Sequence, residues 1–112
     1  MRHFIRIFAN CEDDANAKAL VANILLALSH HSPASLKVPK QYWKVPEYYE
    51  FTFLLSAATE EAYQELIESS SGGWHHSGAQ GEWSSVWNRE GDHVFLVPEV
   101  AWAEVQLYEE AL

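Results

Sequence analysis

The sequence changes character at residues 42–53, which read YWKVPEYYEFTF. The second half of this stretch predicts a strand, because apolar and polar residues alternate there with the period of two that separates the faces of a sheet. Tyr49, Phe51 and Phe53 form the apolar set, and Glu50 and Thr52 lie between them. We therefore expect a core strand at about residues 47–56, which begins with an acidic and aromatic segment.

The same stretch divides the chain by charge. Residues 1–44 contain six basic and three acidic residues, a formal charge of +3, whereas the remainder contains one basic residue and 13 acids, a formal charge of −12. The whole chain carries −9. This charge argues against nucleic acid as the main ligand, because that binding depends on Lys and Arg that neutralise phosphates. It favours a basic partner, although a net charge also keeps a protein soluble.

The length and composition predict one domain at residues 1–112. An apolar content of 48% is ample for a hydrophobic core. Cys11 is the only cysteine, so an internal disulfide is excluded and a reducing compartment is expected. The chain shows neither a signal peptide nor an apolar run long enough to span a bilayer. We expect a cytoplasmic protein with no membrane partner.

Toward the N-terminus, the pattern predicts a strand followed by a helix. Residues 2–9 alternate between a mostly apolar face and an aromatic, basic face. Asn10 is the expected helix cap, and the three acids that follow suit the positive end of the helix dipole. The helix should run to about His30 and end at Pro33. Its apolar stripe consists of Ala17, Leu20, Val21, Ile24, Leu25 and Leu28.

Two further elements are expected in the middle of the chain. Residues 36–45 read as an extended edge segment, which Pro39 interrupts because it cannot donate a ladder hydrogen bond. Thr59 is the expected cap of a short helix. The inner side of this helix offers Ala62, Tyr63, Leu66 and Ile67. Its glutamates face water.

The C-terminal third predicts a loop and then strands. Residues 69–81 are rich in Ser and Gly and are expected to form a long loop. Residues 82–88 and 93–97 are expected to pair as a hairpin. Residues 99–110 alternate with a period of two and favour a last strand, with a helix as the alternative because Ala and Glu favour one.

The order of these elements predicts an α+β fold. It resembles a ferredoxin-like sandwich, in which two helices cover one face of a mostly antiparallel sheet, with an extra C-terminal hairpin. The other face of such a sheet stays open unless something covers it. This fold hosts many unrelated functions, so it does not decide the function.

The sequence offers few catalytic groups. Glu47 and Glu50 are three residues apart, so in a strand they point to opposite faces and make a poor acid–base pair. Cys11 is expected to be a quiet, partly buried thiol. The pairs His30–His31 and His75–His76 lack the spacing of metal ligands. A metal site from His75, His76 and His93 with a carboxylate stays open as an alternative, but we expect neither metal nor cofactor.

Aromatic residues and acids are the stronger functional signal. The chain has five Trp and five Tyr, which interfaces favour because they bury a large area at low entropic cost. Acids near them in sequence would steer a basic partner. The pattern leaves open whether Trp83 and Trp87 belong to the core or to an interface. The predicted partner-binding residues are Trp43, Glu47, Tyr48, Glu50, Trp74, Glu82, Trp83, Glu90, Asp92, Glu99, Trp102 and Glu104.

The chain resembles the small acidic immunity proteins that bacteria encode beside toxins, particularly those of contact-dependent growth inhibition. The resemblance is carried by residues 42–51, reading YWKVPEYYEF, residues 81–87, reading GEWSSVW, and residues 98–103, reading PEVAWA. It implies neutralisation of a basic nuclease toxin domain, an RNase or a DNase, by binding that occupies or covers the active site. It implies no catalytic residue in this chain.

Two alternatives belong to other functional classes. One is a ferredoxin-like regulatory module that binds a small molecule on the sheet. The other is a small enzyme that uses His75, His93 and a carboxylate. The oligomeric state is left open by the sequence.

Overall fold

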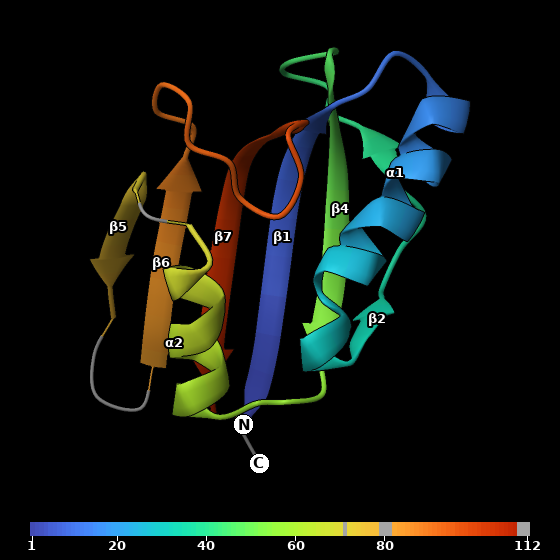
Figure 1. Cartoon of the computed structure of the whole chain (residues 1–112). Coiled ribbons are helices and arrows are strands. Elements are labelled where there is room, and N and C mark those ends of the chain that lie inside the picture. Colours follow the sequence, from blue (N-terminus) through green and yellow to red (C-terminus); the bar gives the residue numbers. More distant parts are fainter. Residues whose placement is uncertain (71, 79–81, 110–112) are drawn as a thin grey trace.

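The computed structural model describes residues 1–70, 72–78 and 82–109. It shows an α+β fold in which two helices lie on one side of an antiparallel sheet (Figure 1). The strands are β1 Arg2–Asn10, β2 Pro33–Ser35, β3 Lys40–Gln41, β4 Tyr48–Leu55, β5 Trp74–Ser77, β6 Glu82–Asn88 and β7 Val100–Tyr108. The helices are α1 Asp14–Ala27, the short 3-10 helix η1 Ser29–His31 and α2 Glu60–Glu68.

Strand β1 lies at the centre of the sheet, between β4 and β7. The strand order is β2-β4-β1-β7-β6-β5, and β3 pairs with the other end of β4. Every pairing is antiparallel. The register with β7 shifts between Phe8 and Ala9, as at a β-bulge. Strands far apart in the sequence are therefore neighbours, and β1 brings the two halves of the chain together.

The core lies between the sheet and the helices. Ile5 and Ile7 of β1 and Phe51 and Phe53 of β4 are buried there, as their alternation predicts. The predicted α1 stripe is confirmed, because Ala17, Leu20, Ile24 and Leu28 are buried and Val21 and Leu25 pack against the core. The inner side of α2 is also as predicted. Thr59 caps α2, since its side chain accepts a hydrogen bond from the Ala62 N–H at 3.1 Å.

The expected cap of α1 is wrong. Asn10 is the last residue of β1, and its N–H donates to the Glu99 carbonyl at 3.0 Å. The ladder thus continues past the position where the sequence predicts a helix. Asp13 is the N-cap instead, because its carboxylate accepts a hydrogen bond from the Asn16 N–H at 2.8 Å.

The expected hairpin of residues 82–88 with 93–97 is also wrong. Strand β6 pairs with β5 on one side and with β7 on the other. Residues 93–97 form no ladder with β6, because Phe95 turns into the core and its ring lies 5.8 Å from that of Trp87. A single bridge joins Phe95 to Val97, around Leu96 with a φ of 63°.

The expected loop at residues 69–81 contains a strand. Residues 74–77 form β5, which pairs with β6 from Trp74 opposite Trp87 to Ser77 opposite Ser84. Residues 71 and 79–81 of that loop lie outside the described residues. The last strand is confirmed as β7, and residues 36–45 lie at the sheet edge as expected. Within the described residues, no helix has the length and apolarity needed to cross a membrane.

Candidate binding face

One face of the sheet carries neither helix in the described structure. Figure 1 shows α1 and α2 on the same side, and the segment containing Phe95 packs on that side too. The opposite surface, here called the open face, receives the outer side chains of the four longest strands. They include Phe4, Arg6, Phe8, Tyr48, Glu50, Leu54, Trp102, Glu104, Gln106 and Tyr108.

Four rings form an aromatic cluster at one end of the open face. We use this name for Phe8, Tyr42, Trp43 and Trp102. The ring centroid of Phe8 lies 4.5 Å from that of Tyr42 and 5.2 Å from that of Trp102, and Tyr42 lies 6.3 Å from Trp43. Strand register causes this, because Phe8 is directly opposite Trp102. The Tyr42 N–H donates to the Tyr48 carbonyl at 2.7 Å, which holds the third ring beside them.

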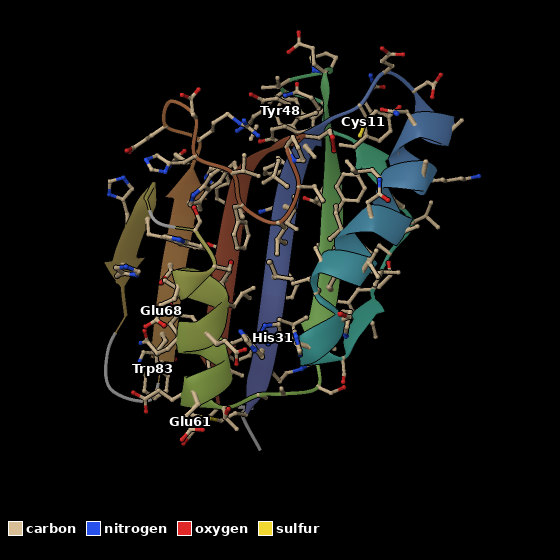
Figure 2. All side chains as sticks on the ribbon, viewed as in Figure 1. Cys11, His31, Tyr48, Glu61, Glu68 and Trp83 are labelled. Carbon is tan, nitrogen blue, oxygen red and sulfur yellow. The ribbon has the colours of Figure 1, made fainter. Side chains whose placement is uncertain are left out.

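A shallow groove of about 450 Å³ runs along the cluster. It is lined by Arg6, Phe8, Tyr42, Val45, Tyr48, Asn88, Ala101 and Trp102. Figure 2 labels Tyr48 at the upper end of the sheet, where the groove lies. Trp43 stands at its margin with 78% of its surface exposed, more than any other large apolar side chain that the structure describes. Exposed aromatic surface of this kind suits a binding site better than a core.

Cations of the chain itself already contact these rings. The Cζ atom of Arg6 lies 4.9 Å from the Phe8 centroid, and Nζ of Lys44 lies 5.1 Å from the Trp43 centroid. Arg6 also donates to Oε2 of Glu50, from Nε at 2.8 Å and from a terminal nitrogen at 2.5 Å. Ring faces and carboxylates attract cations. Arg6 and Lys44 thus already engage Phe8, Trp43 and the Glu50 carboxylate in the free protein.

The structure brings five of the twelve predicted site residues together. Tyr48, Glu50, Trp102 and Glu104 lie on the open face, and Trp43 lies at its margin in the turn between β3 and β4. Glu47 lies in the same turn but lines a pocket beside Cys11. Glu82 sits opposite Tyr108 at the far end of the sheet. Glu90 and Asp92 lie in the segment between β6 and β7, and Glu99 borders the same pocket as Glu47.

The tryptophans of β5 and β6 belong to the helix side. Trp87 is fully buried, and its Nε1 donates to the Gly72 carbonyl at 2.7 Å and to Oγ of Ser70 at 3.2 Å. Trp74 packs edge-on against Phe95 with centroids 5.1 Å apart. Trp83 is half-buried against the same core (Figure 2). Trp87 is thus a core residue, and the other two have packing roles.

The histidines do not form a metal cluster in the described part of the chain. No group of three His, Cys, Asp or Glu side chains there could hold a metal ion. Nδ1 of His76 lies 2.7 Å from Oγ of Ser85, which also shares a hydrogen bond with the Tyr63 hydroxyl. Ser85 is fully buried, so this hydroxyl is inaccessible to a substrate.

Cys11 is a quiet thiol in the structure. It is 8% exposed, and burial, with the nearby charges of Glu99 and Asp13, raises its pKa to about 11. A thiol with a raised pKa is a weak nucleophile, because the thiolate is the reactive form.

Sequence reasoning missed Arg6, Phe8 and Tyr42 as site residues. The alternation of β1 places Arg6 and Phe8 on the outer face, but only the pairing of β1 with β4 and β7 brings them to Glu50 and Trp102.

Comparison with known proteins finds no matching family model, no matching curated protein and no matching solved structure.

Proposed function

We propose that this protein is a non-enzymatic binding protein, an immunity protein that neutralises a basic nuclease toxin domain in the cytoplasm. The observation that carries the proposal is the aromatic cluster on an open sheet face of a chain with a charge of −9. Within the cluster Trp43 is exposed, Tyr42 and Trp102 are half-buried, and Phe8 is buried beneath them. On this account the chain supplies no catalytic residue, metal or cofactor of its own.

The cluster has the properties of an interface anchor. A few aromatic side chains carry most of the binding energy in typical interfaces, and they lie centrally with polar groups around them. Tyr42 and Trp102 are held against the buried ring of Phe8, so little conformational entropy is lost when a partner packs on them. Glu104 lies opposite Arg6 on the open face and offers a carboxylate to a cationic surface, whereas the Glu50 carboxylate is already bound to Arg6.

The regional acidity supports a basic partner. Complementary charge raises association rates and suppresses binding to wrong partners. Because the DNA- or RNA-binding surface of a nuclease is basic, an acidic protein that covers it competes directly with the substrate. We therefore propose that the active site of the nuclease is occupied or covered.

We also propose that the fold is ferredoxin-like in its finer topology. The strand order β2-β4-β1-β7 supports this relation, since the order of a βαββαβ unit places the first strand between the third and the last. On this reading β5 and β6 form a hairpin inserted between α2 and the last strand. The inserted hairpin then replaces the C-terminal hairpin that the sequence suggested.

The test is binding to the nuclease domain encoded beside this gene. The domain and this protein are purified separately, mixed and analysed by calorimetry and by a nuclease assay. We expect a one-to-one complex, loss of nuclease activity, and association that slows as salt rises. A neighbouring nuclease that stays fully active in excess of this protein contradicts the proposal.

A small-molecule module is the second candidate, and the groove favours it. About 450 Å³ beside Arg6, Phe8 and Trp102 is enough for a planar anionic compound. A thermal-shift screen of anionic aromatic metabolites distinguishes the two functions. A metabolite that stabilises the protein while the nuclease domain does not bind would favour the module.

A further inference from the structure

The two edges of the sheet differ in how they are protected. One edge consists of two short strands, β2 and β3, and contains Pro33, Pro39, Lys37 and Lys40. Short strands, prolines and lysines prevent an edge from pairing with other chains. The other edge is β5, where Trp74–Ser77 includes neither proline nor any charged residue. Strand β5 is also short, with four residues, but it lacks the prolines and lysines of the first edge.

The outer side of β5 presents backbone hydrogen-bonding groups. The Asn88 N–H donates to the Gly73 carbonyl at 2.9 Å, so residue 73 is hydrogen-bonded to β6. Backbone groups alternate in direction along an antiparallel strand. Residues 75 and 77 thus bond to β6, whereas the N–H and C=O groups of Trp74 and His76 point away from the sheet.

An acidic helix surface flanks this edge. Helix α2 lies over β6, because the Tyr63 hydroxyl meets Ser85, and β5 is the next strand. Glu65 lies on the side of α2 toward η1, since its charge acts on His31 there. At 100° per residue, Glu60 lies about 140° from Glu65 around α2, on the side toward β5, whereas Glu68 lies only about 60° from Glu65 and faces solvent. Glu60, Glu65 and Glu68 line one outer surface of the helix, which is therefore acidic.

We propose that β5 accepts an extended, lysine- or arginine-bearing segment of a partner protein as an additional strand. Backbone bonds to Trp74 and His76 would hold the segment, and α2 would pair with its cations. This is strand addition, a recurrent mode of peptide recognition. The inference rests on the proposed function only in taking the partner to be basic. A second copy of this chain is a poorer occupant, because both copies carry −9 and the same acidic helix.

Two variants at one position separate backbone pairing from side-chain effects. His76→Pro removes the outward N–H, and the β6 ladder does not use that group. His76→Ala is the matched control, since it keeps the N–H and loses the same side-chain bond to Ser85. Circular dichroism checks that both variants stay folded.

The probe is a short capped peptide in which lysine alternates with threonine. We expect the amides of Trp74 and His76 to gain protection from hydrogen exchange when it binds. Affinity should be retained in His76→Ala and fall roughly tenfold in His76→Pro, as for the loss of one backbone hydrogen bond. A peptide N-methylated at every second residue has the same charge and should bind more weakly, which tests the pairing even if His76→Pro unfolds.

Equal binding of the methylated and unmethylated peptides would overturn the proposal, as would unchanged exchange at both amides. A dimer of the free protein that His76→Pro dissolves would also overturn it, in favour of a second copy on β5. The peptide experiment uses no nuclease, so its failure leaves the proposed function standing. Conversely, the nuclease domain can fail to bind while the peptide still pairs with β5.

Discussion

Cys11 shows how burial, with nearby acids, sets the chemistry of a residue. It follows β1, its N–H donates to the Glu47 carbonyl at 3.1 Å, and its thiol is shielded beside the start of α1. Two acids add to the effect of burial on its pKa, which rises to about 11. The thiol therefore stays protonated at neutral pH.

We predict that iodoacetamide modifies native Cys11 very slowly at neutral pH. The thiolate is the reactive form, and a pKa two units above the ordinary value of 9.0 lowers its population about a hundredfold. Mass spectrometry follows the reaction with and without urea. Cys11 is the only cysteine, so all modification occurs there. The sample in urea gives the rate for the same thiol when it is exposed. Equal rates in both samples would show that the thiol is exposed.

His3 and His31 are also buried titratable residues. Nδ1 of His3 donates to the Ala57 carbonyl at 2.9 Å, and the two rings lie 6.3 Å apart. Burial lowers the pKa of both imidazoles; the charge of Glu65 opposes the shift at His31. Folding therefore disfavours the protonated form of both rings.

This pair should make the protein less stable in acid. A histidine whose pKa is lowered on folding binds its proton more readily in the unfolded chain, so stability is complete above about pH 6.5 and falls as the pH drops below it. Urea unfolding at several pH values between about 5 and 7 measures the slope. His3→Gln combined with His31→Gln should flatten it, and an unchanged slope would assign the effect to other groups.

At the scale of elements, local patterns were predictable and long-range pairings were not. The alternation of Phe51 and Phe53 and the stripe through Leu20 and Ile24 are visible in sequence, because neighbours within one element set them. The residues around Phe95 read as a strand in the sequence, yet in the structure Phe95 packs against Trp74 and Trp87 instead of lying in a ladder. Strand β6 pairs with β5 and β7 instead of with residues 93–97.

The candidate site follows the same division. Trp43, Glu50 and Trp102 could be proposed from residue type, since exposed aromatics and acids mark interfaces. Their assembly with Phe8 could not, because it depends on a strand order that joins residues far apart in the chain. Trp74 was also proposed because it is a tryptophan. Its partly buried position could not be predicted, because it depends on the place of Phe95 in the fold.

Gly73 fixes the start of the β5–β6 hairpin. Its φ is 91°, and a Cβ there would meet the Asn88 carbonyl and Nε1 of Trp87. We predict that Gly73→Ala lowers the free energy of unfolding by about 3 kcal/mol, from backbone strain and overpacking together.

Gly91→Ala is the control for backbone strain. Its φ is 54°, but a Cβ there meets nothing within 4 Å, so about 1 kcal/mol is expected. Urea unfolding compares the two variants. Equal losses would show that the close approach at Gly73 does not matter.

At the scale of the whole molecule, the lysines and most of the C-terminal acids lie toward different edges of the sheet, with Glu50 of β4 opposite Lys40 as an exception. The four lysines lie on α1, between β2 and β3, on β3, and in the turn before β4, all toward one edge of the sheet. The acids of α2, β6 and β7 lie toward the other edge. The aromatic cluster stands where the two regions meet, so a partner on the open face contacts both rings and carboxylates.

The most direct test of the open face compares two exposed side chains on opposite sides of the sheet. Trp43 is 78% exposed beside the aromatic cluster, and Leu26 is 75% exposed on α1. Neither supports the core, so Trp43→Ala and Leu26→Ala should both leave the free energy of unfolding almost unchanged. Calorimetry then measures the affinity of each variant for the neighbouring basic nuclease domain. We predict a loss of at least about tenfold for Trp43→Ala, as for an interface hot spot, and no change for Leu26→Ala. Full affinity in Trp43→Ala, or an equal loss in Leu26→Ala, would contradict binding through the open face.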